Sequence, residues 1–112
     1  MIEKIVQDYL VENTDVPCYP EMPEEPPKSF ALIEKTGSGE SNYILSATIA
    51  IQSYASTLYK AACLNESVKA AMRKITGLPQ ISSCNLNSDY NFTDSNKKKY
   101  RYQAVFDIYY YE

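Results

Sequence analysis

The chain ends in Tyr100-Arg-Tyr-Gln-Ala-Val-Phe-Asp-Ile-Tyr-Tyr-Tyr-Glu112, a stretch in which the side chains alternate between two faces. One face of the expected strand carries Tyr102, Ala104, Phe106, Ile108 and Tyr110. The other face carries Arg101, Gln103, Val105, Asp107, Tyr109 and Tyr111. A period of two, filled by aromatic and β-branched residues, is typical of a β-strand that buries one face in a core. The fold should therefore be built around a sheet that contains this strand.

The second face of this strand is not purely polar, because it includes Val105, Tyr109 and Tyr111. Tyrosine combines an apolar ring with a polar hydroxyl, and protein–protein interfaces are enriched in such side chains. A face of this kind either packs against another surface or stays partly exposed to solvent. We therefore predict that these three residues contribute to an interface with another protein chain.

Length and charge restrict the possible functions. The chain has 112 residues, and we expect a single domain over residues 1–112. Its net charge of −3 argues against nucleic acid as the main partner, because that binding needs a basic field. No apolar run approaches the roughly 20 residues that cross a bilayer. The first residues lack the order of a signal peptide, so we expect synthesis in a cytoplasm and no membrane partner.

The residue types argue against catalysis. The chain has no histidine, which removes the commonest general base and metal ligand. Cys18, Cys63 and Cys84 are widely spaced, so each is predicted to be a small buried hydrophobe. No glycine-rich phosphate motif occurs. Asp89 and Asp94 leave a two-carboxylate site as the remaining alternative. We expect no catalytic residue, no cofactor and no metal ion.

The N-terminal part should contain one helix and one irregular segment. Residues 1–12 carry apolar side chains at helical spacing: Ile2, Ile5, Val6, Tyr9 and Leu10. Residues 16–28 hold five of the six prolines and are predicted to be a rigid, irregular connection. A short edge strand at residues 16–19, or a polyproline ligand for an aromatic groove, are the alternatives for this segment.

A hairpin should follow, with strands at residues 29–35 and 43–52. The stretch between them is rich in glycine and serine, which predicts a flexible loop at residues 36–42. A phosphate-binding loop is less suitable, because no helical pattern follows directly. We predict that the loop contacts a partner, which adds five residues to the candidate interface: Thr36, Gly37, Ser38, Gly39 and Glu40.

The remaining residues predict a helix and a second hairpin. The main helix is expected at residues 53–76, with Asn65 as a possible kink or second start, and it ends at Gly77 and Pro79. A polar strand is expected at residues 81–92 and a turn at residues 93–99. The three lysines of that turn, Lys97 to Lys99, are interpreted as a solvated tip, with contact to nucleic acid or an acidic partner as the alternative.

These elements predict an α+β fold in the order αββαββ, with a four-stranded, mainly antiparallel sheet and two helices packed on one face. The opposite face of the sheet would then expose aromatic and β-branched residues, and patches of this kind mark contacts with other proteins.

Five short stretches, taken in order, give the chain a resemblance to a known family. They are Val16-Pro-Cys-Tyr19 with Glu21 and Pro23, Ile33-Glu-Lys-Thr-Gly37, Ala50-Ile-Gln-Ser-Tyr-Ala55, Asn87-Ser-Asp-Tyr-Asn-Phe-Thr-Asp94, and Tyr100-Arg-Tyr-Gln-Ala-Val-Phe106. Over nearly its whole length the chain resembles the tail-terminator, or tail-completion, proteins of long-tailed bacteriophages of Gram-positive bacteria, which are also labelled minor capsid or head–tail joining proteins. The family usually has a second glycine directly after Thr-Gly, where this chain has Ser38.

The resemblance implies a structural virion protein with no active site. It implies an α+β domain that assembles into a homo-oligomeric ring, commonly a hexamer, in the bacterial cytoplasm. The ring caps the tail tube, contacts the tail tube protein and joins the tail to the head connector protein, and DNA meets it only by passing through the lumen. The alternatives are another head–tail connector component and, in a different class, a small oligomeric ligand-binding regulatory domain. An enzyme is the least favoured class.

Overall fold

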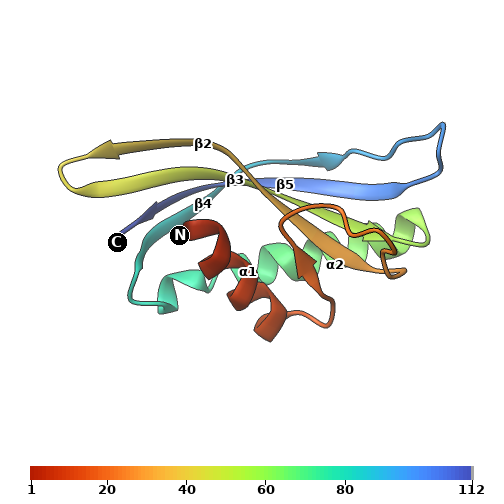
Figure 1. The fold of residues 1–112 in the computed structure, drawn as a ribbon, viewed down its shortest axis with the longest axis horizontal. Helices are drawn as coiled ribbons and strands as arrows, with labels where there is room; N and C mark the ends of the chain where they lie inside the picture. Colours follow the sequence, from red (N-terminus) through yellow and green to blue (C-terminus); the bar gives the residue numbers. More distant parts are fainter. Residues whose placement is uncertain (112) are drawn as a thin grey trace.

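The strand expected at the C-terminus lies inside the sheet that organises the whole molecule (Figure 1). The computed structural model describes residues 1–111, so Glu112, the last residue of the expected domain, lies outside the described residues. The molecule is elongated, with principal extents of 45 × 25 × 24 Å. Its helices and strands are α1 (Ile2–Asn13), β1 (Cys18–Tyr19), β2 (Phe30–Ser41), β3 (Ile44–Ala55), α2 (Leu58–Met72), the 3-10 helix η1 (Ile75–Gly77), β4 (Ile81–Asn91) and β5 (Tyr100–Tyr110).

The sheet has five strands in the order β1-β2-β3-β5-β4, so the prediction of four strands is wrong by one. The additional strand is β1, which pairs in parallel with β2 through Cys18–Ala31 and Tyr19–Leu32, while all other pairs are antiparallel. The backbone N–H of Ala31 also donates to the carbonyl of Pro17 at 2.9 Å. Proline lacks a backbone donor, so the prolines around these residues keep the strand to two residues. The element order is therefore α-β-β-β-α-β-β, within an α+β fold as expected.

The alternation of β5 is confirmed. Ala104, Phe106 and Ile108 are buried, whereas Tyr109 on the opposite face is 44% exposed. The buried residues lie opposite Ile51, Ile49 and Ala47 of β3, which are also buried. This pairing places the apolar faces of the two central strands side by side.

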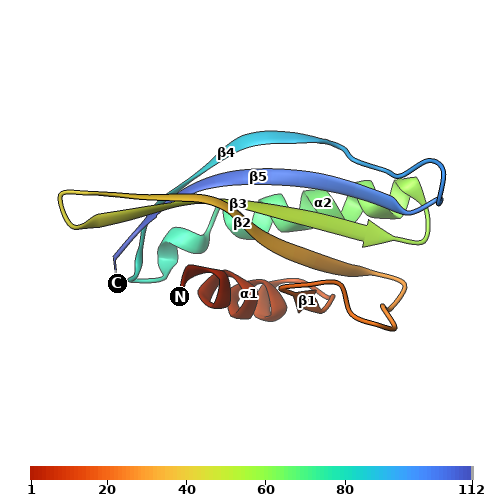
Figure 2. The same ribbon diagram turned by 45° about the horizontal axis from the view of Figure 1, so that its top comes forward.

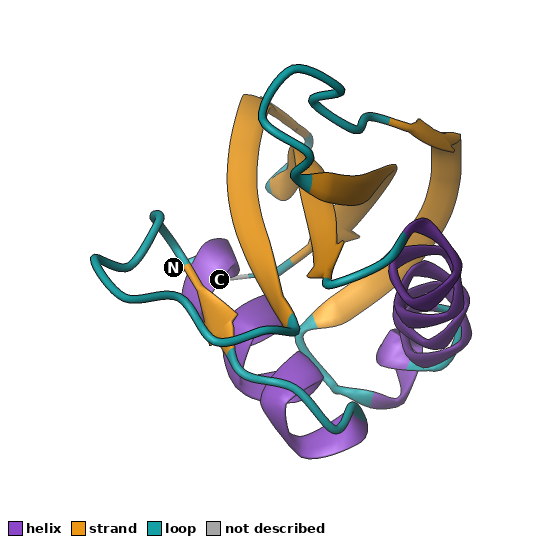
Figure 3. Cartoon of the chain, turned by 90° about the vertical axis from the view of Figure 1, so that its right-hand side faces the viewer, coloured by secondary structure: helices purple, strands orange, loops and turns teal. Residues whose placement is uncertain are grey.

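Both helices pack on that apolar face. They share one cluster of buried side chains with β3 and β5, to which α1 contributes Ile2, Val6 and Leu10, and α2 contributes Val68, Ala71 and Met72. The amphipathic pattern expected for the first helix is thus confirmed. Figure 1 shows both helices below the sheet, Figure 2 shows α2 behind the strands and α1 below them, and Figure 3 looks along the strands and shows their twist.

The segment predicted to be a flexible loop, Thr36–Asn42, is instead paired strand up to Ser41. Backbone pairing continues from Gly37–Thr48 to Ser41–Ile44, and a bulge between Lys35 and Gly37 accommodates the extra residue. Glycine and serine permit such pairing when the opposite strand supplies a regular partner, and here β3 does so. The turn consists only of Asn42 and Tyr43, whose φ angles are 52° and 67°. We call the paired stretch from Gly37 to Thr48 the arm, because it projects beyond the helices (Figure 1).

The main helix begins five residues later than predicted, at Leu58 instead of Ser53. Ser53, Tyr54 and Ala55 remain in β3, where they pair with β5. Thr57 caps the helix, because its hydroxyl accepts the backbone N–H of Lys60 at 3.1 Å. Helical spacing and strand alternation both fit the apolar residues of this stretch, and the tertiary pairing decides in favour of the strand.

Asn65 is neither a kink nor a second start, because α2 is continuous through it. Its side chain is buried, and its Nδ2 donates to Asp89 of β4 at 2.6 Å. The ammonium of Lys69 also contacts Asp89, at 2.6 Å, and hydrogen bonds to Asp89 and Glu66 raise the pKa of Lys69. These contacts attach the edge strand β4 to the helix.

The second hairpin agrees with the sequence pattern. β4 covers Ile81–Asn91, one residue shorter than expected, and the turn lies between it and β5. In that turn the carboxylate of Asp94 accepts the backbone N–H groups of Asn96 and Lys97, and the backbones of Asp94 and Lys99 pair. The turn therefore has a defined structure.

The three cysteines occupy different environments. Cys18 is buried and Cys84 is half-buried, but Cys63 is exposed on α2, so the prediction of a buried hydrophobe is wrong for Cys63. Burial raises the pKa of the Cys18 thiol to about 12. Burial and the charge of Asp107 raise that of Cys84 to about 11.

A raised thiol pKa leaves little thiolate for reaction at neutral pH. We expect iodoacetamide to label Cys63 in the native protein well before Cys18 and Cys84, and all three to react after denaturation. Mass spectrometry of tryptic peptides at timed intervals measures this order. Labelling of Cys18 as fast as Cys63 in native buffer would contradict the burial described here.

The two faces of β5 predict mutational losses of different size. Phe106→Ala removes a buried ring from the core and should lower the free energy of unfolding by about 3–5 kcal/mol. Tyr109→Ala removes a half-exposed ring and should cost about 1 kcal/mol or less. Urea unfolding followed by circular dichroism compares the two variants. Equal losses would show that the faces are assigned incorrectly.

Candidate protein interface

The face of the sheet that points away from the helices, here called the outer face, has two distinct ends. One end lies at the arm and is formed by small polar residues and glycines. The other lies where β3 leads into α2 and is formed by aromatic residues. The residues predicted to form an interface gather mainly at the arm end.

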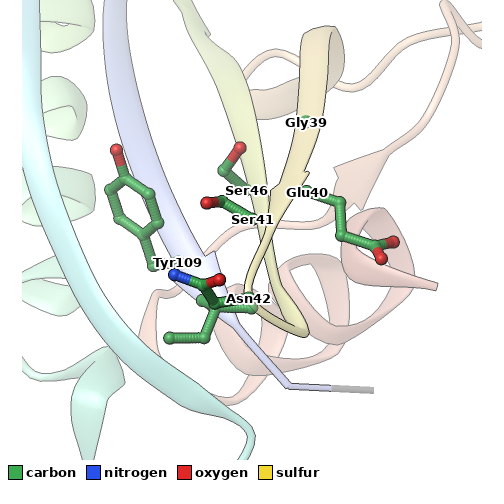
Figure 4. A pocket seen from close by; sticks show the side chains of 7 residues that line it. Gly39, Glu40, Ser41, Asn42, Ser46 and Tyr109 are labelled. Carbon is green, nitrogen blue, oxygen red and sulfur yellow. The ribbon is translucent and has the colours of Figure 1, made fainter.

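At the arm end, Tyr109 borders two adjoining hollows of about 480 and 320 Å³, and Figure 4 shows the residues that line the first of them. Tyr109 lies opposite Ser46 of β3, and Ser46 in turn lies opposite Gly39 of β2. A Cβ atom at Gly39 would lie only 3.0 Å from the Ser46 hydroxyl oxygen, so the close approach depends on glycine. We call this surface the furrow. It lies between the ring of Tyr109 on β5 and the glycines Gly37 and Gly39 on β2, which have no side chain to fill it.

Two hydrogen bonds fix the floor of the furrow. The hydroxyl of Thr48 donates to one carboxylate oxygen of Asp107 at 3.1 Å, and Nδ2 of Asn87 donates to the other at 2.9 Å. Asp107 therefore joins β3 to β4 across β5. A partner would meet a surface whose shape is set before binding, which lowers the entropic cost of association.

The predicted residues do not all lie together. Gly37, Ser38, Gly39 and Glu40 line the two hollows with Tyr109, although Figure 4 shows the side chain of Glu40 turned away from Tyr109. The other three predicted residues lie elsewhere: Thr36 at the bulge, Val105 half-buried in the middle of β5, and Tyr111 after the end of β5. The structure thus brings five of the eight together.

Sequence reasoning missed an aromatic cluster at the opposite end of the outer face. The rings of Phe30 and Tyr54 stack with their centroids 4.6 Å apart, and the ring of Tyr19 meets Phe30 edge-on at 5.9 Å. The guanidinium of Arg101 lies 4.5 Å from the centroid of Phe92 and 5.6 Å from that of Tyr54. The cation–π contacts link Arg101 of β5 to Tyr54 of β3 and to Phe92 just after β4, and ring stacking links Tyr54 to Phe30 of β2, all on the side away from the helices.

A chain of hydrogen bonds runs beside this cluster in one direction. Arg101 donates to the hydroxyl of Tyr54 at 2.7 Å, and that hydroxyl donates to Gln52 at 2.9 Å. The amide of Gln52 donates to Gln103 at 2.9 Å, and Gln103 donates to the hydroxyl of Tyr90. Each group is a donor to the next, which allows the bonds to polarise one another. Gln52 and Tyr54 are buried by these contacts although they belong to the outer face.

A signal for this cluster was present in the sequence. Tyr19, Tyr54, Phe92 and Arg101 come from four of the five stretches that carry the family resemblance, and the fold brings these stretches together. The assignment of Tyr54 to a helix concealed the convergence, because a helical Tyr54 would not lie beside Phe30. The correct extent of β3 is therefore needed to find the cluster.

Within residues 1–111, no group of three or more cysteine, aspartate or glutamate side chains is arranged to hold a metal ion. No helix in the described part of the chain is long and apolar enough to span a membrane. In comparisons with known proteins, no family model matches the chain, and no curated protein sequence matches it significantly.

Proposed function

We propose that the protein is a structural virion protein that forms a ring, caps the tail tube of a long-tailed bacteriophage and joins the tail to the head connector. The observation that carries this proposal is the arm. It is a long hairpin with exposed side chains that extends past the helices, so it is available for contact with another chain. The resemblance of five stretches to tail-terminator proteins supplies the class of assembly.

The furrow adds support from its composition. It combines the ring of Tyr109 with small polar groups and lacks a deep enclosed cavity for a small molecule. Such a surface suits a protein partner, because aromatic side chains with polar tips are favoured where two chains meet. On this proposal the ring contains copies of this chain, commonly six, and the arm and furrow contribute to its contacts.

The arm can be shortened without removing core residues. Residues 40–45 are exposed or half-buried, and Gly39 and Ser46, which flank them, are paired. Replacing residues 40–45 by Asn-Gly gives a turn that two-residue hairpins favour. We expect this variant to fold with a free energy of unfolding within about 1 kcal/mol of the original, because changes to surface residues usually alter stability little.

The shortened variant should fail to complement a phage that lacks its own tail terminator. The original chain should yield tails of uniform length joined to heads, and the variant should yield unjoined tails of irregular length, as counted by electron microscopy. Light scattering after size-exclusion chromatography, with and without tail tubes, measures ring formation directly. An original chain that neither binds tail tubes nor complements would refute the proposed function.

A further inference from the structure

The tip of the arm carries a tyrosine where a glycine would be more stable. Tyr43 is 93% exposed, and its φ of 67° lies in the left-handed region that two-residue hairpin turns require. A residue with a Cβ atom is less favourable than glycine in this conformation. Strain of this kind is found at functional positions. The side chain of Tyr43 makes the isolated chain less stable, which points to a contact with another molecule.

The opposite end of the molecule has a cavity with complementary chemistry. Its volume is about 170 Å³, and its lining combines apolar and aromatic groups with three lysines: Met22, Pro26, Lys28, Phe30, Tyr54, Ala55, Lys98, Lys99 and Tyr100. Every charged residue of this lining is a lysine. In residues 1–111, none of these lysines forms a salt bridge. The cavity therefore offers aromatic surfaces inside a rim of unpaired positive charge.

The walls of the cavity are held in place by the fold. Phe30 and Tyr54 are stacked and buried, and Arg101 donates to the hydroxyl of Tyr54. Lys98 and Lys99 belong to the turn that the carboxylate of Asp94 stabilises. The proline-rich segment forms the remaining wall, and proline restricts its backbone. A cavity with fixed walls binds a side chain with little loss of conformational entropy.

Tyr43 cannot reach the cavity of its own chain. Tyr43 directly precedes β3, and Ala55 at the other end of β3 lines the cavity. At about 3.3 Å per residue, the 12 steps from Tyr43 to Ala55 separate the two by roughly 40 Å. Figures 1 and 2 show the tip and the turn before β5 at opposite ends of the molecule. A contact between them therefore requires a second copy, and repeated head-to-tail contacts close into a ring when the rotation fits.

We propose that Tyr43 of one copy inserts into this cavity of the next copy and that Glu40 faces the lysine rim. Glu40 is the only charged residue between Lys35 and Lys60, so the arm presents a single negative charge to the lysines. The ring of Tyr43 packs against the aromatic walls, and its hydroxyl stays near the charged rim. This inference rests on the proposed ring and identifies the contact that closes it.

The first test replaces the residue that carries the strain. Tyr43→Gly should leave the midpoint of urea unfolding unchanged or raise it, because glycine adopts the required φ without cost. It should weaken association between copies by about 30-fold or more, which is the effect expected of a central aromatic residue in an interface. Tyr59→Ala, at another strongly exposed tyrosine on α2, is the matched control and should leave association unchanged. Analytical ultracentrifugation, on tail tubes if the ring forms only there, measures both.

The second test identifies the neighbouring surface. Tyr43→p-benzoylphenylalanine, irradiated in a mixture of isotopically labelled and unlabelled copies, should cross-link to peptides of the other copy that contain Phe30 or Lys99. The charge pairing is tested separately, since Lys98→Glu with Lys99→Glu should weaken association and Glu40→Lys should restore it in the same chain.

The outcomes separate this inference from the proposed function. Normal association of Tyr43→Gly, or cross-links to the tail tube protein or to other peptides, would overturn the inference even if the rings still cap tails. Rings that depend on Tyr43 but fail to cap tails would refute the proposed function and leave the inference standing. If the original chain associates neither in solution nor on tail tubes, both are wrong.

Discussion

The pairing of β3 with β5 is the interaction on which the rest of the structure depends. Eleven consecutive residue pairs join the two strands without a bulge, from Leu45–Tyr110 to Ala55–Tyr100. On one face this pairing aligns the buried side chains against which both helices pack, and on the other it aligns Gln52 with Gln103 and Tyr54 with Arg101. Because side chains alternate with a period of two, a shift of one residue would exchange the two faces entirely.

The central pairing also explains why the two ends of the outer face differ. Towards Ala55, β3 is buried on both faces, because α2 covers one side and the aromatic cluster the other. Towards Ile44, β3 is half-exposed, since β2 and β3 continue as the arm beyond the helices. One strand thus changes from a fully enclosed core element to a surface hairpin, and the two surfaces of the proposed head-to-tail contact lie at its two ends.

The sequence predicts most of the fold because its periodic patterns are local. The alternation of β5, the amphipathic α1 and the position of the turn before β5 are all confirmed. The errors occur where tertiary pairing overrides local signals. Glycines and serines between residues 36 and 42 indicate a loop, but β3 supplies a partner for each; Tyr54 fits a helix, but β2 and β5 hold it in the sheet. Hydrogen bonding with distant strands is not visible in a short window of sequence.

The candidate site was less accessible to sequence reasoning than the fold. Tyr109 was identified because a tyrosine on the polar face of a strand is locally unusual, and the structure places it beside Gly39. The sequence does not reveal the lysine-rimmed cavity, because its lining comes from three separate parts of the chain. The sequence predicts a solvated tip at Lys97 to Lys99; all three are exposed, and Lys98 and Lys99 also border a hollow that contains aromatic rings. Only the folded chain brings these groups together.

The order of strands has a consequence for the protein before assembly. β1 covers only two residues of β2, so beyond Leu32 the outer edge of β2 has no strand beside it in the described chain. An open edge of this length invites further strands to add without limit, as in fibrils. Glu34, Lys35 and Glu40 place charges along this edge, and the bulge at Thr36 interrupts its regular hydrogen-bond pattern. These features disfavour uncontrolled strand addition to the newly made chain, so the proposed ring would form through side-chain contacts and not through the open edge.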